Sequence, residues 1–369
     1  MGNNPKKKAI ILYTCAGAGH FKAADALYHY LEIYRPDLEV TLVDVLKKTN
    51  HFFAVSYIRG YSFLVNYAVF LWRFSFWVTS FKPLRKIVRL AAIAMTRLNS
   101  RDFIAFLCRE NPDFIISTHF LPSQIACDLK NRGEINSKVT TIITDFGVHP
   151  FWLSQGTDEY IAVSDFTRLN LIREGVSSDK IKVLGIPVHP KFFTAFDKNI
   201  LCVKLGLTKD KFTVLIVTGS FGIGPIEKIV DLLHDDLQLL VVCARNEALF
   251  GRLKEKNYAY AHIYGFVDNI EELMAASDII ITKPGGLTIA EILVSELPPI
   301  FIHPIQGQET ENIRALAGYG VGIYAKSLKE IKDAVLDYKK NAQNLNLIRE
   351  NIRKLKKSFQ PKELCDVVC

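Results

Sequence analysis

The sequence predicts an α/β protein built from two doubly wound domains, and three observations indicate this fold class. The chain has 369 residues, which exceeds the roughly 100–200 residues of one domain. Apolar residues make up 49% of it and charged residues 23%, a composition that supports sizeable cores and excludes disorder. Strand-like runs alternate with helical stretches in both halves of the chain, which is typical of a parallel sheet covered by helices on both faces.

Each half contributes its own series of strands. In the first half the expected strands fall within residues 9–15, 39–45, 113–119, 140–145, 159–164 and 181–187, with a helix from about 20 to 34 after the first. In the second half they fall within residues 213–222, 237–244, 262–267, 278–286 and 298–304. The predicted domains are therefore 1–190 and 191–345, followed by a C-terminal helix and tail, 346–369. Because ligands of such sheets bind beyond the carboxyl ends of the strands, function is expected in the loops that follow them.

Cysteine usage and the N-terminal residues bear on the compartment. The seven cysteines are scattered, odd in number and form no C-x-x-C pair, which favours a reducing compartment and argues against a zinc site or a disulfide framework. The apolar run after the basic start is short and continues into a glycine turn, so no signal peptide is expected. These features predict a cytoplasmic protein.

Positive charge and aromatic side chains are concentrated in residues 47–101. This segment holds ten basic residues and no Asp or Glu, whereas the whole chain has a net charge of +8. It also holds twelve aromatic residues, between Phe52 and Phe81. Clustered Trp and Phe mixed with Leu and Val, as around Trp72 and Trp77, favour a lipid surface over the phosphate-binding groove that nucleic acid requires.

Within this segment, residues 82–98 have the pattern of a basic amphipathic helix. Apolar residues recur at helical spacing at Leu84, Ile87, Val88, Ala91, Met95 and Leu98. Arg85, Lys86 and Arg89 lie on the remaining surface, a pattern that suits an anionic bilayer. The preceding residues 60–81 are long enough to cross a bilayer, but Arg73 near their middle would cost about 2.5–3.5 kcal/mol. We therefore expect a segment that lies in the membrane interface, and the alternative is that these helices form an ordinary buried core.

A glycine turn joins the first expected strand to the first helix. In GAGHFK, residues 17–22, Gly17 and Gly19 let the backbone approach a ligand, and His20 can accept a proton near neutral pH. A dinucleotide-binding turn would need a third small residue at Lys22, which disfavours a nicotinamide-dependent enzyme. For a lone histidine, a capping or packing role is the alternative.

Three turns in the second half have the composition of a phosphate or sugar site. TGSFGIGP, residues 218–225, can present backbone N–H groups, but it lacks the G-K-[ST] ending of a nucleoside triphosphatase. TKPGGLTIAE, residues 282–291, repeats the arrangement, although Thr288 and Glu291 also match a helix capping box. HPIQGQETEN, residues 303–312, supplies donors and acceptors that suit sugar hydroxyls.

Six motifs together carry a family resemblance. They are GAGHFKAA (17–24), TDFGVHPFW (144–152), GIPV (185–188), TGSFG (218–222), TKPGGLTIAE (282–291) and PIQGQETEN (304–312). In this order they resemble the monogalactosyldiacylglycerol synthase and processive diacylglycerol β-glucosyltransferase family, in glycosyltransferase family 28, relatives of the bacterial enzyme that makes the peptidoglycan lipid precursor. The resemblance covers residues from about 8 to 340. It implies a GT-B fold, two Rossmann-like domains facing a central cleft, with an N-terminal acceptor- and membrane-binding domain and a C-terminal nucleotide-sugar domain.

The resemblance also implies a reaction and roles for residues. The reaction is the inverting transfer of a hexose from UDP-galactose or UDP-glucose to diacylglycerol. His20 is similar to the group beside the acceptor hydroxyl, as general base or acceptor anchor, and Asp145 resembles an acidic residue that orients His20 or is itself the base. The implied acceptor and membrane residues are Gly17, Gly19, His149, Trp152, Trp72, Trp77, Arg85, Lys86 and Arg89. The implied donor residues are Gly219, Ser220, Gly222, Gly285, Gly286 and Thr288 at the diphosphate, Glu291 at the ribose, Gln308, Glu309 and Asn312 at the sugar, and Phe266 and Val267 at the uracil.

The partners follow from the same resemblance. No D-x-D pair occurs in the chain, which is consistent with a leaving group stabilised by helix dipoles and backbone amides, with no metal or other cofactor required. The expected partners are a UDP-sugar, diacylglycerol or a related lipid, and the inner face of the cell membrane, where the protein would associate peripherally. Two alternatives stay open at this point: a UDP-N-acetylglucosamine enzyme, either a transferase to a polyprenyl or other lipid or a 2-epimerase, and a nucleotide-sugar or lipid-binding protein without turnover.

Overall fold

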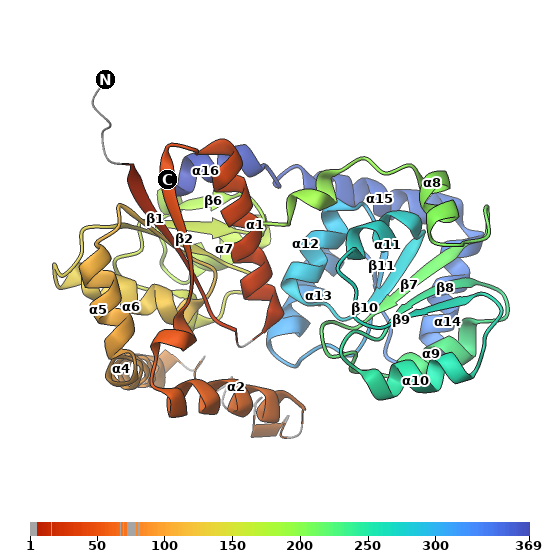
Figure 1. Ribbon diagram of the computed structural model, residues 1–369, viewed down its shortest axis with the longest axis horizontal. Coiled ribbons are helices and arrows are strands. Elements are labelled where there is room, and N and C mark those ends of the chain that lie inside the picture. Colours follow the sequence, from red (N-terminus) through yellow and green to blue (C-terminus); the bar gives the residue numbers. More distant parts are fainter. Residues whose placement is uncertain (1–5, 16, 67, 69, 72–78, 80–81) are drawn as a thin grey trace. The chain divides into compact units, whose positions relative to one another are not determined.

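The computed structural model describes residues 6–369 except 16, 67, 69, 72–78, 80 and 81. The chain forms two compact units, each with one six-stranded sheet (Figure 1). The first unit comprises Met1–Pro190, Ile305–Glu311 and Ser358–Cys369, and the second comprises Lys191–Pro304 and Asn312–Lys357. The predictions for Trp72 and Trp77, and for the side chains of Arg85, Lys86 and Arg89, lie outside the described residues.

The first unit is a parallel sheet with strand order β2-β1-β3-β4-β5-β6. Its strands are β1 (Lys7–Tyr13), β2 (Leu38–Asp44), β3 (Phe114–Ser117), β4 (Lys138–Ile142), β5 (Glu159–Ala162) and β6 (Ile181–Val183). Its helices are α1 (Ala18–Tyr34), η1 (Val45–Lys48), α2 (His51–Asn66), α4 (Lys82–Asn99), α5 (Arg101–Glu110), α6 (Phe120–Asn131), η2 (Pro150–Trp152), α7 (Asp165–Arg173), η3 (Ser178–Lys180) and α16 (Pro361–Val368). All six strands expected in this half are confirmed.

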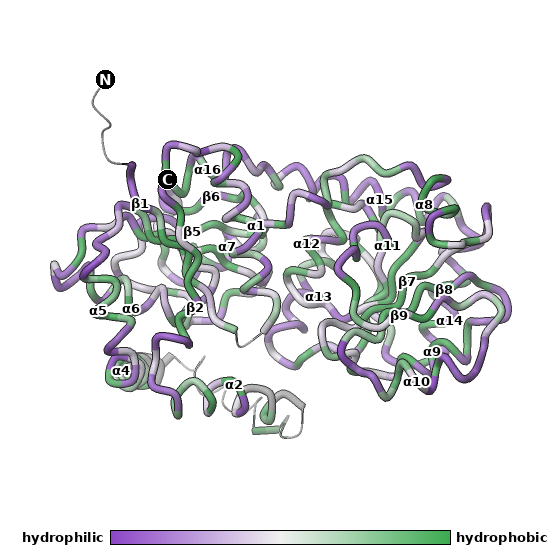
Figure 2. The backbone as a smooth tube through the Cα atoms, in the orientation of Figure 1, coloured by the Kyte–Doolittle hydropathy of each residue, from purple (hydrophilic) through white to green (hydrophobic). Residues whose placement is uncertain are grey.

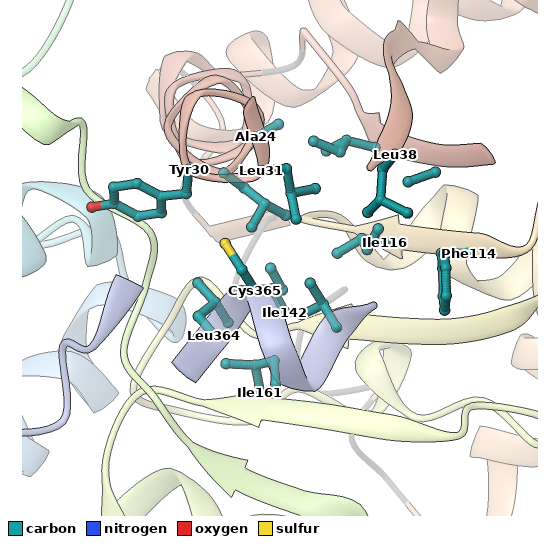
Figure 3. Packing of buried hydrophobic residues seen from close by; sticks show 14 of the residues in the cluster. Ala24, Tyr30, Leu31, Leu38, Phe114, Ile116, Ile142, Ile161, Leu364 and Cys365 are labelled. Carbon is teal, nitrogen blue, oxygen red and sulfur yellow. The ribbon is translucent and has the colours of Figure 1, made fainter. Parts of the chain in front are cut away.

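The C-terminal helix α16 shares one face of this sheet with α1. Leu31 of α1 is fully buried in the same hydrophobic cluster as Ile116 of β3 and Ile161 of β5. Leu364 and Cys365 of α16 belong to this cluster too (Figure 3). The last twelve residues, 358–369, therefore fold with the first unit although the residues before them belong to the second. The apolar pattern of the tail does not indicate which unit it joins.

The second unit is a parallel sheet with strand order β12-β11-β10-β7-β8-β9. Its strands are β7 (Thr213–Val217), β8 (Gln238–Val242), β9 (Ala261–Tyr264), β10 (Ile279–Thr282), β11 (Pro299–Phe301) and β12 (Ile323–Tyr324). Its helices are α8 (Lys198–Lys204), α9 (Ile226–Leu233), α10 (Glu247–Glu255), α11 (Ile270–Ala276), α12 (Gly286–Val294), α13 (Gln308–Gly318, which starts in the first unit), α14 (Leu328–Lys340) and α15 (Ala342–Lys356). The link between the units contains η4 (Pro190–Phe193).

Counted from the first strand of the unit, this is the strand order of dinucleotide-binding folds. The strands are continuous apolar runs (Figure 2), because helices remove both faces of a parallel sheet from water. The five expected strands are confirmed. The sequence analysis missed the sixth, β12, because two residues are too short to show a periodic pattern.

In each sheet the strand order reverses beside the first strand of the unit. β1 pairs with both β2 and β3, and β7 pairs with both β8 and β10. Doubly wound sheets bind their ligands at this reversal, beyond the carboxyl ends of the two central strands. The turns that follow β1 and β3, and those that follow β7 and β10, are therefore the places to look for a site.

Helix α4 lies where the amphipathic helix was predicted, and several of its described apolar side chains are exposed instead of buried. Ile87, Leu90 and Leu98 of α4 are about two-thirds exposed. Phe52 and Phe63 of α2 are also exposed. Among the described residues, no helix has the length and apolar character needed to cross a membrane.

Candidate functional site

A cavity of about 760 Å³ lies in the first unit at the carboxyl ends of the central strands. Its polar residues include His20 from the first turn of α1, and His119 and Asp145 from the turns after β3 and β4. Further polar residues of the lining include Gln124, His149, Arg173, Glu174, Gln308 and Glu311. Its apolar wall comes from α2, α4 and the turns after β3 and β4, and includes Phe53, Tyr57, Leu64, Met95, Phe120, Phe151 and Trp152. A largely apolar cavity with a few convergent polar groups is the usual form of a small-molecule site.

His20 stands in the first turn of α1, where Gly17 precedes the helix in an extended conformation. Its Nδ1 lies 2.7 Å from the carbonyl oxygen of Thr118 and 3.2 Å from the hydroxyl oxygen of Thr144. Because a carbonyl oxygen only accepts, Nδ1 carries the hydrogen and Nε2 keeps its lone pair. Burial lowers the pKa of His20 to about 4, although the hydrogen bond to Thr118 acts in the opposite direction. The ring of His20 is therefore neutral at neutral pH, with its hydrogen on Nδ1 and a lone pair on Nε2.

His119, which the sequence analysis missed, is the second histidine of the cavity. It is almost fully buried, and its Nδ1 accepts from the backbone N–H of Leu121 at 3.1 Å, which leaves the hydrogen of the neutral ring on Nε2. Its ring meets His20 edge to face at 4.6 Å between centroids. Burial lowers the pKa of His119, and the nearby charge of protonated His20 adds to this effect. Of these two rings, His20 thus offers an acceptor nitrogen and His119 a donor nitrogen. The position of His119 at the carboxyl end of the expected strand within 113–119 was the signal that could have found it.

Asp145, predicted as a catalytic residue, and Gln308, predicted at the sugar, are brought together. Gln308 Nε2 donates to Asp145 Oδ2 at 2.7 Å, and both residues line the cavity. Gly147 makes this approach possible, because a Cβ at that position would overlap the side chain of Glu311. The carbonyl of Thr118 accepts from Nδ1 of His20 and so helps to orient this ring. Both roles predicted for Asp145, orienting His20 or being the base, stay predictions.

The remaining acceptor-side predictions fall on or beside the same cavity. Gly17, His149 and Trp152 line it, whereas Gly19 is half-buried within the first turn of α1. His149 begins the short helix η2, with its Nδ1 accepting from the N–H of Phe151 at 3.3 Å and its Nε2 3.0 Å from the hydroxyl oxygen of Thr79. The ring centroid of Trp152 lies 6.3 Å from that of His20.

In the second unit, the turn after β7 is held in shape by its glycines. Gly219 and Gly222 have φ values of 81° and 56°, which only glycine adopts without strain. A Cβ on Gly222 would overlap the carbonyl oxygen of Cys243. Asn246 Nδ2 donates to the carbonyl of Gly222 at 3.1 Å, and the N–H of Arg245 donates to the carbonyl of Ser220 at 3.3 Å. The turn is thus fixed against the end of β8, as a backbone-based anion site requires.

The turn after β10 corrects one prediction. The alternative that Thr288 caps the helix is wrong, because α12 begins at Gly286 and its N-cap is Gly285. Glycine has no side chain to cap with, so the first-turn N–H groups receive no hydrogen bond from the cap residue, and such groups bind anions. Thr288 is half-buried in this first turn, and Glu291 is buried one turn further along.

Three other donor-side predictions have local partners. Asn312 is fully buried and its Nδ2 donates to the carbonyl of Pro284 at 3.0 Å, which holds the turn before α12. Glu309 is buried and accepts from the N–H of Ile305 at 2.7 Å. Phe266 is two-thirds exposed beside half-buried Val267, with its ring centre 5.9 Å from the guanidinium carbon of Arg245. An exposed aromatic ring of this kind offers a surface on which a base can stack.

Comparisons with known proteins match both units. Residues 20–188 match the family described as monogalactosyldiacylglycerol (MGDG) synthase, and residues 213–362 match the glycosyltransferase family 28 C-terminal domain. The chain is 32% identical over 366 residues to a chloroplastic monogalactosyldiacylglycerol synthase of Spinacia oleracea, covering 94% of this chain and 69% of that one. It is 28% identical over 361 residues to a processive diacylglycerol beta-glucosyltransferase of Bacillus pumilus, covering 95% and 92%.

Solved structures confirm the predicted fold. MurG from Acinetobacter baumannii shares 13% identity with the chain and has a TM-score of 0.59, over 99% of both chains. At this identity the likeness shows the fold alone. The two parallel six-stranded sheets are the arrangement of a GT-B fold.

Proposed function

Because the chain belongs to the monogalactosyldiacylglycerol synthase family, we propose that it transfers a hexose from a UDP-sugar to diacylglycerol and so makes a glycolipid. The observation that carries the proposal is the cavity of the first unit, where a neutral histidine faces a largely apolar wall. A base is what the acceptor hydroxyl needs, and the apolar wall suits the acyl chains beside it. The relatives are named for galactosyl and glucosyl transfer, so both UDP-galactose and UDP-glucose are candidate donors.

His20 is the proposed general base. Its Nε2 takes the proton of the diacylglycerol hydroxyl while that oxygen attacks C1 of the sugar, and the bond from C1 to the UDP oxygen breaks on the opposite side with inversion. The hydrogen bond from Nδ1 to the carbonyl of Thr118 fixes the ring orientation and the tautomer during this step. A histidine with a pKa of about 4 carries no proton on Nε2 at neutral pH. Nε2 can therefore accept the proton of the hydroxyl without first losing one.

The second unit is proposed to bind UDP and to stabilise it as the leaving group. The turn around Gly219 and Gly222, which has positive φ values, and the uncapped start of α12 are the two places proposed to offer backbone N–H groups to the developing negative charge. Phe266 is proposed to stack on the uracil. No metal is required in this scheme, because backbone dipoles perform the role that a divalent cation has in other transferases.

We test the reaction with diacylglycerol in anionic liposomes and with UDP-galactose, UDP-glucose and UDP-N-acetylglucosamine supplied separately, each with and without chelator. We expect one glycolipid, formed from UDP-galactose or UDP-glucose and unaffected by chelator. Liposomes without diacylglycerol are the control, and they should give no product. Turnover with UDP-N-acetylglucosamine alone would show that the protein is a UDP-N-acetylglucosamine enzyme instead. UDP binding without product from any donor would show that diacylglycerol is not the acceptor.

The acceptor is a membrane lipid, and we propose that α2 and α4 bring the first unit to an anionic membrane surface, the inner face of the cell membrane. Exposed Phe52, Ile87, Leu90 and Leu98 support this, because isolated apolar side chains of this size gain by entering the acyl boundary. The basic residues of α4 add electrostatic attraction of about 1 kcal/mol each at an anionic surface.

Liposome binding tests this docking surface. Reversing the charge of Arg85, Lys86 and Arg89 should weaken binding to anionic liposomes at least about tenfold at low salt, and the difference should shrink as salt rises. The matched control reverses Lys329, Lys332 and Lys340, which are exposed on α14 of the second unit. If both triple variants bind as well as the wild type, or lose binding equally, α4 is not the docking surface.

A further inference from the structure

A second group of ligand-bearing side chains lies in the first unit, on the far part of α1. Asp25, His29 and His189 each offer one oxygen or nitrogen, and these three atoms all lie within 4.8 Å of one another. All three residues are half-buried. From this geometry we propose that Asp25, His29 and His189 form a binding site for a divalent transition metal, of which Zn²⁺ is the best match.

Two of the ligands are set by the helix itself. Asp25 and His29 are four residues apart, which puts both on one face of α1. His29 Nε2 lies 3.9 Å from Asp25 Oδ2. The other ring nitrogen, Nδ1, lies 3.7 Å from Glu32 Oε2. A ligating histidine usually gives its second N–H to a carboxylate, which fixes the tautomer and makes the free nitrogen a better ligand, and Glu32 stands where that carboxylate belongs.

The third ligand comes from the end of the first unit and is held against α1. The buried hydroxyl of Tyr30, also on α1, donates to the backbone carbonyl of Val188, the residue before His189. Figure 3 shows the Tyr30 hydroxyl extending away from the hydrophobic cluster in which its ring packs. His189 precedes Pro190, which favours an extended backbone. The rings of His29 and His189 lie edge to face at 4.9 Å, so the contact that brings them together does not depend on a metal.

The ligand set selects the class of metal. Two imidazoles and one carboxylate suit Zn²⁺ and the neighbouring divalent ions, whereas Mg²⁺ and Ca²⁺ prefer oxygen ligands alone. Bonds of about 2.0–2.1 Å to a tetrahedral Zn²⁺ would bring the ligand atoms closer to one another than they are here, where His29 Nε2 and Asp25 Oδ2 are 3.9 Å apart. Asp25 and His29 are about one-third and two-fifths exposed, so their side chains are free to rotate toward a common ion. A fourth position would remain for water.

This site is separate from the proposed chemistry. His29 follows His20 by nine residues, which is about 14 Å along the helix and half a turn around it. Catalysis therefore needs no metal there. A bound ion would instead fix α1 to residues 188–190, from which the chain passes to the second unit, and it would stabilise the first unit by mass action.

Titration of the full chain with Zn²⁺ alone tests the site. We expect one ion to bind per chain, and we expect His29→Gln and His189→Gln each to weaken binding by at least about tenfold. His234→Gln is the matched control, because His234 also has a carboxylate neighbour, Asp235 at 3.1 Å, but belongs to the second unit and to no such group. Unchanged affinity in both His29→Gln and His189→Gln, or no saturable binding below millimolar Zn²⁺, would overturn the proposal.

Two further measurements separate this site from the exposed thiol of Cys15. Cys15→Ser should bind Zn²⁺ as well as the wild type does, whereas loss of binding in that variant would place the metal on the thiol and reject the site. Added Zn²⁺ should raise the unfolding temperature of the wild type and of Cys15→Ser but not that of His189→Gln.

Glu32→Gln should retain the site with affinity lowered about tenfold.

Discussion

The two units begin alike, with a strand and a glycine-rich turn, but the two turns use glycine differently. After β1 the chain enters α1 within four residues, Gly17 is extended at a φ of −162°, and a Cβ there would meet nothing within 4 Å. After β7 eight residues precede α9, and Gly219, Gly222 and Gly224 all have positive φ. The first turn therefore positions a side chain, His20, whereas the second is proposed to offer backbone N–H groups. Similar glycine spacing in a sequence does not mean that the glycines have the same role.

The largest expected effect follows from the side chain of the first turn. His20→Ala should lower transfer by at least about 100-fold, the usual loss for a general base, while UDP affinity stays nearly unchanged, because the residues proposed to bind UDP itself belong to the second unit. Product formation and UDP titration measure the two quantities. Near wild-type turnover would show that the base is Asp145 or another residue. A loss of UDP affinity as large as the loss of turnover would show that His20 also contributes to donor binding, so that the two turns do not have separate roles.

Gly222→Ala should damage the second turn through its backbone. The substitution combines a φ of 56° with overlap against the carbonyl of Cys243, and strain of this kind costs about 1–3 kcal/mol. UDP affinity should fall about tenfold or more while lipid binding persists. Gly251→Ala is the matched control, since Gly251 lies inside α10 with open space around it, and it should raise stability slightly. Equal UDP affinity in both variants would show that the turn does not shape the donor site.

Asp145→Asn sharpens the assignment of the base. The substitution removes the negative charge that accepts from Gln308 Nε2 but leaves the tautomer of His20, which Thr118 fixes. The asparagine side chain still accepts through its amide oxygen, so a bond to a charged group of about 1.5–3 kcal/mol is replaced by a neutral one of about 0.5–1.5 kcal/mol. Turnover should therefore fall about tenfold, by less than in His20→Ala. If Asp145→Asn is the more damaging of the two, Asp145 is the base.

The pH dependence distinguishes the two turns as well, because only the first contains a titrating group. The pKa of His20 is lowered to about 4 by burial, so kcat/KM should stay level on the acid side until the pH approaches that value. Between about pH 6.5 and 4 the unfolded chain binds a proton that folded His20 does not, so stability should fall as the pH falls. In His20→Ala this part of the stability loss should be smaller. An acid limb near 6.5 in the wild type would contradict the buried, neutral ring.

Gly17→Ala should have the smallest effect. The position is extended and open, so neither strain nor overlap is expected, and turnover should change less than about twofold. Steady-state kinetics beside Gly222→Ala make the comparison direct. A large loss at Gly17 would show that a ligand approaches the backbone of the first turn closely, as the second turn is proposed to allow.

By itself the sequence determined the two sheets and the order of the motifs. Continuous apolar runs, such as Ile10–Leu12 and Leu239–Val242, predict buried parallel strands because both faces of such a strand leave water. The alternation of these runs with helical stretches predicted two doubly wound domains. It also predicted that His20 and the glycine turns follow strands. Periodicity also predicted the helix α4.

Only the tertiary structure decided which of these groups meet. Asp145 and Gln308 are 163 residues apart, and Thr118 reaches His20 across two paired strands, so neither contact leaves a local pattern. The same holds for His189 beside Asp25 and His29, although the helical spacing of the latter two is visible. β12 and α16 were missed because they are short and their burial comes from distant partners. Local propensity acts over a few residues, whereas a site is made where strands far apart in the chain end at one edge of a sheet.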